Sequence, residues 1–157
     1  MDKISFVYDE KGEYAPKKGL EFVKRKNIAA IIKYRNKYLL LDYKNLNYSK
    51  SLVTGGIEQD EDMIKTVTRE VIEETGYIDI KSIEPVDCIN ISRFYVAHKK
   101  QNKEATYYPF LVTLNFKERI DIKEEESREH DCIWIPEKDL DTTDIFENHK
   151  LMIDASK

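Results

Sequence analysis

The chain has 157 residues, of which 41% are hydrophobic and 36% are charged, and its formal net charge is −4. This length and hydrophobic content predict a single domain, spanning residues 1–157, with a core of its own. The net acidic charge and the lack of a long basic run argue against a general nucleic-acid-coating protein.

The first half of the chain predicts two strands followed by a helix. Residues 9–19 are polar and indicate a loop or an irregular arm. Residues 27–34 form a compact apolar run and residues 38–43 form a second one, which predicts two strands joined by a short turn. The helix is expected to begin near residues 60–62, where acidic side chains suit its positive end, and to stop at Gly76.

The second half predicts further strands and a terminal helix. Residues 83–97 contain alternating apolar positions, and residues 107–116 are rich in β-branched and aromatic side chains, so each range indicates a strand. Residues 132–135 are short and apolar, and a last helix is expected over residues 143–155. The order of strands, helix, strands and helix predicts an α/β fold in which helices cover both faces of a mixed sheet.

Cysteine usage and apolar patterning indicate the compartment. Cys88 and Cys132 lie far apart in the sequence, without a C-x-x-C motif, and are expected to be reduced thiols. The first residues lack the apolar core of a signal peptide, and no apolar run approaches the length of a membrane span. We therefore expect a cytoplasmic protein without a membrane partner.

The most distinctive segment is residues 55–77, which holds seven carboxylates and only two cations. Glu70, Glu73 and Glu74 stand at helical spacing i, i+3 and i+4, so they share one face of the predicted helix. Three negative charges this close together repel one another, and a bound cation would offset that cost. Their hard oxygen ligands suit Mg²⁺ or Mn²⁺, metals that commonly serve phosphate chemistry.

The fixed positions of this segment resemble a known signature. From Gly55 onward the pattern is G-x5-E-x7-R-E-U-x-E-E-x-G-U, in which U is a bulky apolar or aromatic residue. The residues at these positions are Gly55, Glu61, Arg69, Glu70, Val71, Glu73, Glu74, Gly76 and Tyr77. The segment is similar to the Nudix box, and the chain resembles the Nudix hydrolase family.

This resemblance implies a Nudix-type α/β/α sandwich whose box forms a loop, a helix and a loop. The implied ligands of a divalent metal are Glu70, Glu73, Glu74 and the carbonyl oxygen of Gly55. Glu61 and Arg69 would form an ion pair that supports the box. The implied reaction is attack of water on a phosphorus atom of a nucleoside diphosphate derivative, which breaks the pyrophosphate link.

A second segment, residues 127–136, adds a further candidate. It resembles the Glu-His sequence ahead of a Trp-bearing strand in some Nudix hydrolases of nucleotides and dinucleoside polyphosphates. There the Glu is a further metal ligand or base, so Glu129 is the candidate here, and Glu126 is the next. The alternative is that Glu129 is one more charge in an acidic loop. His130 is expected to be a positioning or surface residue.

Three residues outside the box are candidates for binding substrate. Tyr95 lies 18 residues beyond Tyr77 and resembles a marker of diadenosine polyphosphate hydrolases, in which a Tyr near this distance stacks on a base. Tyr108 offers a second ring for stacking, although core packing is the alternative. Arg93 is a candidate for contact with phosphate, with a surface ion pair as the alternative.

These patterns together predict a Nudix pyrophosphohydrolase that depends on Mg²⁺ or Mn²⁺ and acts on a nucleotide-derived small molecule. Glu74 or Glu129 would deprotonate the water. One alternative is removal of pyrophosphate from an RNA 5′ end, which a small basic cluster at Lys99, Lys100 and Lys103 permits. Another is a sensor that binds a nucleotide without cleaving it, although the complete box argues against that role. The patterns leave open which nucleotide is the substrate and what the oligomeric state is.

Overall fold

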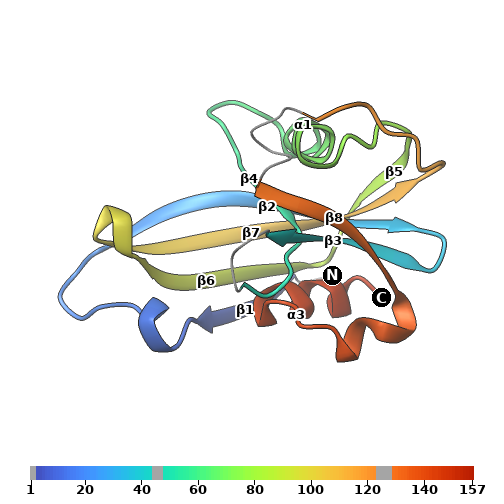
Figure 1. Cartoon of the computed structure of the whole chain (residues 1–157). Coiled ribbons are helices and arrows are strands. Elements are labelled where there is room, and N and C mark those ends of the chain that lie inside the picture. Colours follow the sequence, from blue (N-terminus) through green and yellow to red (C-terminus); the bar gives the residue numbers. More distant parts are fainter. Residues whose placement is uncertain (1–2, 44–47, 123–128) are drawn as a thin grey trace.

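The computed structural model describes residues 3–43, 48–122 and 129–157, which form one mixed sheet with helices on both faces (Figure 1). The strands are β1 (Ile4–Asp9), β2 (Phe22–Tyr34), β3 (Lys37–Tyr43), β4 (Val53–Gly56), β5 (Ile80–Pro85), β6 (Cys88–Val96), β7 (Gln101–Leu114) and β8 (His130–Pro136). The helices are α1 (Met63–Thr75) and α3 (Glu147–Ala155), with 3-10 turns η1 (Gly12–Tyr14), η2 (Ala97–Lys99) and η3 (Glu137–Thr142). The predicted α/β architecture is confirmed.

The strands of the described ranges lie in the order β1-β6-β7-β2-β3-β8, with β4 paired to β2 and β5 paired to β7. β2 runs parallel to β7, and β1 runs parallel to β6. The remaining pairs are antiparallel, so the sheet is mixed, as predicted. None of the helices described is long and apolar enough to cross a membrane.

The central strand β2 supplies both cores, because its side chains alternate between the two faces of the sheet. Ile28 and Ile32 belong to the core that includes Val67 and Val71 of α1. Ile31 belongs to the other core, which includes residues of α3. Burial on both faces explains why this part of β2 is a continuous apolar run rather than an alternating one.

The structure extends or corrects several predicted elements. β1 was not predicted, β2 starts earlier than expected, and the single strand expected within residues 83–97 is divided between β5 and β6. The first residues of β2, Phe22–Lys26, are exposed, so their pairing with β7 rather than burial makes them a strand. The last helix starts at Glu147 rather than at residue 143, because η3 and the turn after it occupy the preceding residues.

Candidate active site

Two caps fix the ends of α1 and thereby the position of its carboxylates. At the N-terminus, the Asp62 side chain accepts hydrogen bonds from the backbone N–H groups of Ile64 and Lys65, at 2.9 and 3.2 Å. At the C-terminus, Gly76 has a φ of 74°, and its N–H donates to the Ile72 carbonyl at 2.9 Å. This left-handed φ favours glycine. Both predicted ends of the helix are therefore confirmed.

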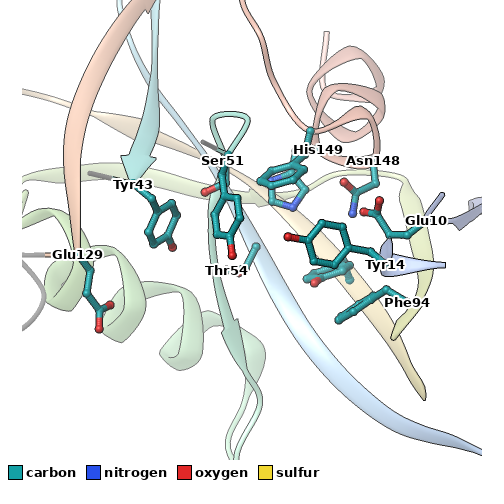
Figure 2. A pocket seen from close by; sticks show the side chains of 12 residues that line it. Glu10, Tyr14, Tyr43, Ser51, Thr54, Phe94, Glu129, Asn148 and His149 are labelled. Carbon is teal, nitrogen blue, oxygen red and sulfur yellow. The ribbon is translucent and has the colours of Figure 1, made fainter. Parts of the chain in front are cut away.

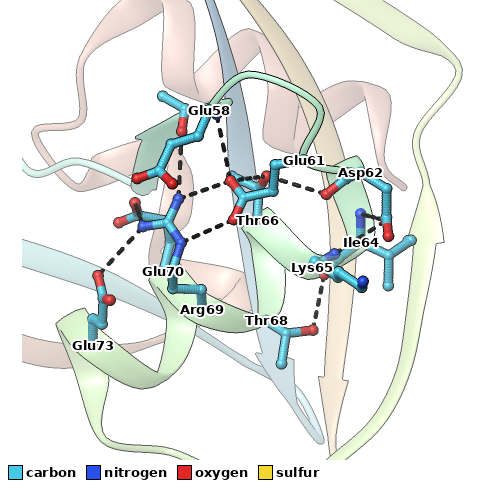
Figure 3. A network of polar contacts seen from close by, with 11 residues as sticks. Glu58, Glu61, Asp62, Ile64, Lys65, Thr66, Thr68, Arg69, Glu70 and Glu73 are labelled. Carbon is cyan, nitrogen blue, oxygen red and sulfur yellow. Dashed lines mark hydrogen bonds and ion pairs between the residues drawn. The ribbon is translucent and has the colours of Figure 1, made fainter.

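Arg69 is the centre of a polar network on one flank of α1 (Figure 3). Its Nη2 and Nε donate to the two carboxylate oxygens of Glu61, at 3.0 and 3.2 Å, so the predicted ion pair is confirmed. Its Nη1 lies 2.7 Å from Glu70 Oε1 and 3.5 Å from Glu73 Oε2. Hydrogen bonds from Arg69 and then from Thr66 lower the pKa of Glu61 to about 2. One guanidinium thus compensates three carboxylates of the box.

Gly55 brings the end of β4 directly against the box helix. A Cβ atom at this position would overlap the side chain of Glu70, so no other residue fits while Glu70 keeps its place. The carboxylates of Glu70 and Glu73 form ion pairs with Arg69. In the described ranges, no three His, Cys, Asp or Glu side chains converge as a group of metal ligands. The close approach of a glycine backbone to a carboxylate nevertheless suits a hard divalent cation.

Glu74 lies in the last turn of α1 and contacts His130 of β8. The buried ring of His130 donates through Nε2 to the Glu74 carbonyl at 2.7 Å, because a carbonyl can only accept. His130 Nδ1 lies 3.8 Å from Glu74 Oε2 and has no hydrogen-bond partner within the described part of the chain. His130 is therefore not at the surface: it holds the last turn of α1 in place beside the Glu74 carboxylate.

A cavity of about 560 Å³ has Tyr43 and Glu129 in its wall (Figure 2). Its wall is largely aromatic, with polar side chains at intervals. The residues that line it are Glu10, Tyr14, Tyr43, Tyr48, Ser51, Thr54, Phe94, Tyr107, Glu129, Phe146, Asn148 and His149. Glu129 and Tyr43 lie at one end, and Glu10 and Tyr14 lie at the other (Figure 2). This volume is typical of sites that bind small molecules.

Tyr43 links the cavity to the box. Burial, followed by the negative charges of Glu74 and Glu129, raises the pKa of its hydroxyl, whereas a hydrogen bond with Ser51 lowers it. The charges of both candidate bases therefore reach the Tyr43 hydroxyl. The exposed Glu129 lines one end of the cavity, and Glu74 on α1 is near enough for its charge to affect Tyr43 there.

The three predicted substrate-binding residues do not line this cavity. Arg93 is paired with Glu104 at 3.0 Å, which matches the alternative of a surface ion pair. The ring of Tyr95 lies under the ammonium of Lys17, at 4.3 Å. Tyr108 packs against the core on the α1 side of the sheet.

The neighbours of those residues line the cavity instead. Phe94 precedes Tyr95 and Tyr107 precedes Tyr108, and successive side chains of a strand point to opposite faces. Glu10, Asn148 and His149 also line the cavity, and sequence reasoning missed them because no local motif marks them. The second acidic candidate, Glu126, lies outside the described residues.

His149 predicts a pH dependence of stability. Its Nδ1 accepts a hydrogen bond from the Leu52 N–H at 2.9 Å, and burial lowers its pKa from 6.5 to about 4. Between these two pH values, His149 is therefore protonated in the unfolded chain but neutral in the folded protein. Stability should fall as the pH drops through this window, by about 3 kcal/mol from this group. Urea unfolding at several pH values measures the loss.

The matched variant is His149→Asn, whose side-chain oxygen can still accept from Leu52 but cannot titrate. Its stability should vary less between pH 7 and pH 4 than that of the wild type. Equal pH dependence in the two proteins would show that His149 is not held neutral by the fold.

Comparison with known proteins gives consistent findings. The family model described as the NUDIX domain matches residues 23–155. A MutT protein from Bacillus halodurans superposes with a TM-score of 0.64 at 20% identity, covering 83% of this chain and 80% of that one. The NUDIX domain of Shewanella oneidensis NrtR in complex with ADP ribose has a TM-score of 0.64 at 18% identity, covering 85% and 86%.

A C. elegans Ap4A hydrolase also superposes, with a TM-score of 0.59 at 18% identity, covering 83% of this chain and 93% of that one. At these identities the superpositions establish the shared fold. A search of curated protein sequences finds no match.

Proposed function

The chain belongs to the Nudix family and is a hydrolase of pyrophosphate bonds, and we propose that it cleaves a nucleoside diphosphate derivative in a reaction that requires Mg²⁺ or Mn²⁺. The observation that carries this proposal is the position of Tyr43. This residue lines an aromatic cavity, and the charges of Glu74 and Glu129 contribute to the raised pKa of its hydroxyl. A site for a flat ring thus adjoins a cluster of carboxylates.

The residues that would hold the metal are Glu70, Glu73 and Glu74, with the carbonyl oxygen of Gly55. When bound, the metal would neutralise phosphate charge and lower the pKa of water. The carboxylate of Glu74 or Glu129 accepts a proton from the attacking water as the water oxygen forms a bond to phosphorus. The bond from that phosphorus to the bridging oxygen breaks, which leaves two phosphate-bearing products. Arg69 keeps the acidic helix compensated.

The aromatic wall supports a nucleotide rather than an inorganic polyphosphate. Rings such as those of Phe94 and Tyr107 can stack on a base. Stacking stabilises binding of any base and does not depend on the sugar. The descriptions of two proteins with this fold name nucleotide derivatives: one is in complex with ADP ribose and the other is an Ap4A hydrolase. We also propose a cytoplasmic location, in keeping with the free thiols of Cys88 and Cys132.

One observation favours a second candidate, the 5′ end of RNA. Burial, followed by the nearby charges of Arg25 and Lys99, lowers the pKa of Lys103, so these three cations are gathered together. Lys103 pairs with Phe94, and paired residues share a face of the sheet, so Lys103 lies on the face of the cavity. A nucleotide in the cavity could direct a following phosphate toward these cations.

Metal removal tests the proposal. We expect release of phosphate-bearing products from dinucleoside polyphosphates, nucleotide sugars, ADP-ribose, nucleoside triphosphates or triphosphorylated RNA to stop in excess EDTA and to return with Mg²⁺ or Mn²⁺. Activity confined to RNA would select the second candidate. Appreciable turnover in EDTA would remove the metal-dependent mechanism. Binding of a nucleotide without turnover on any substrate would instead establish a sensor.

A further inference from the structure

The two ends of the cavity have different chemistry. Glu129 and Tyr43 mark one end (Figure 2), where the charge of Glu74 reaches Tyr43 and where the phosphates would lie. Glu10 lies near Asn148 at the opposite end, with Tyr14 and Phe94 close by (Figure 2). If the polyphosphate occupies the first end, the second end is where the edge of a base meets protein polar groups.

The hydrogen-bonding character of this second end is largely fixed by its neighbours. Asn148 Nδ2 donates to Ser92 Oγ at 2.9 Å. The Ser92 hydroxyl uses its own hydrogen to donate to Asn90 Oδ1 at 2.6 Å, so toward Asn148 it can only accept. This relay uses one hydrogen of the Asn148 amino group, and the Oδ1 atom of Asn148 can accept a hydrogen bond from a ligand. The oxygen is an acceptor.

His149 is fixed in the opposite sense. Because its Nδ1 accepts from the Leu52 N–H, the neutral ring carries its hydrogen on Nε2. His149 therefore presents a donor, whereas Asn148 presents an acceptor. These two residues thus offer a base one donor and one acceptor. The carboxylate of Glu10 then determines whether acceptors predominate in the cavity.

Glu10 is a hydrogen-bond acceptor that no cation of the described ranges neutralises. Its backbone is held by a hydrogen bond from its N–H to the Arg93 carbonyl at 2.9 Å, which continues the pairing of β1 with β6. Within the described residues, its carboxylate makes no ion pair. Burial, followed by the charge of Glu147, raises the pKa of Glu10, and Glu10 in turn contributes to the raised pKa of Tyr107. A partly desolvated carboxylate of this kind favours ligands that donate hydrogen bonds.

Among the common bases, guanine presents two adjacent donors, its N1–H and its N2 amino group. Their spacing matches the two oxygens of one carboxylate, as in other bidentate pairs. Adenine and cytosine place an unprotonated ring nitrogen beside their amino group, and its lone pair would face a carboxylate oxygen. Uracil offers one N–H flanked by two carbonyl oxygens. A carboxylate therefore discriminates in favour of guanine.

We propose that Glu10 is a specificity-determining residue that binds the N1–H and N2 amino group of a guanine base, so that the substrate is a guanosine nucleotide. This inference rests on the proposed function for the place of the phosphates. The rings of Phe94 and Tyr107 form the apolar wall beside the base, and Glu10 reads its edge. The direct interaction is with substrate, at the end of the cavity away from the bond that breaks.

Matched nucleotides test the proposal. For the wild type, kcat/KM should be highest for the guanosine compound and about 10- to 100-fold lower for the adenosine compound. The inosine compound, which lacks only the N2 amino group, should lie between them. Equal values for the guanosine and inosine compounds, or a preference for adenosine, would overturn the assignment.

Glu10→Gln is the decisive variant, because it replaces two acceptors by one acceptor and one donor. An amide complements the amino group and ring nitrogen of adenine, so the preference for guanosine should shrink by about 10-fold or more or reverse. The control is Glu13→Gln, which changes an exposed carboxylate outside the cavity and should keep the preference. An unchanged preference in Glu10→Gln would overturn the role of Glu10.

Calorimetric binding of GMP, IMP and AMP to wild type and Glu10→Gln separates this inference from the reaction itself. Preferential binding of GMP that Glu10→Gln abolishes supports the inference even if no compound is hydrolysed, and only the proposed function would then fail. Hydrolysis without any base preference in turnover or binding would leave the proposed function intact and sink the inference.

Discussion

Replacing Glu74 by Gln is expected to lower kcat by about 10²-fold or more, the loss typical of a key catalytic group. The change removes a negative charge that would contact the metal or accept the proton of the attacking water, while it keeps the size of the side chain. The stability of the fold should change little, because His130 donates its hydrogen bond to the backbone carbonyl of Glu74, which the substitution retains. Steady-state kinetics together with thermal unfolding measure both effects.

Glu129→Gln compared with Glu74→Gln separates the two candidate bases. Both carboxylates affect Tyr43, so proximity alone does not rank them. Replacing the base should flatten the acidic limb of the pH–rate profile. Replacing a metal ligand should instead raise the metal concentration needed for half-maximal rate. The matched control is Glu84→Gln, an exposed carboxylate on β5, which should behave like the wild type. A Glu74→Gln enzyme with wild-type kcat would contradict the site.

Gly55→Ala should be the second most damaging change, although it adds only one methyl group. The new Cβ would overlap the side chain of Glu70, which must then leave its position beside Arg69. Because Glu70 is a flexible side chain, the fold should survive while the metal site loses its geometry. The metal concentration for half-maximal rate should rise by about 10-fold or more.

The neighbouring glycine provides the control. A Cβ at Gly56 would meet only the Asn27 side-chain oxygen, at 3.8 Å, which is an ordinary contact. Gly56→Ala should therefore keep near wild-type metal dependence. If the two variants behave alike, the close approach of Gly55 to Glu70 has no part in binding the metal.

The sequence predicted the box well because its signals are local. Asp62 and Gly76 cap a helix whose face repeats every three or four residues, and the pairing of Glu61 with Arg69 depends on little beyond that helix. The apolar run of β2 likewise predicted a strand, since both of its faces are buried. In each case a few neighbouring residues contain the whole physical reason.

The cavity could not be predicted in the same way, because its residues come from distant parts of the chain. Glu10 follows β1, Phe94 lies on β6 and His149 lies on α3. Choosing Phe94 over Tyr95 requires knowing which face of β6 looks toward α3, and a shift of one residue reverses that choice. β1 itself has mostly exposed side chains, so no core pattern marked it as a strand.

The most direct test of the central claim is to identify the bond that breaks. A nucleoside diphosphate derivative cleaved with Mg²⁺ in heavy-oxygen water should give two phosphate-bearing products, one of which carries a single heavy oxygen on its phosphate. Mass spectrometry of the products measures this directly, with Glu74→Gln as the inactive reference. Products in which the label is on the sugar or on a released nucleoside would mean that water does not attack phosphorus, and they would contradict the account.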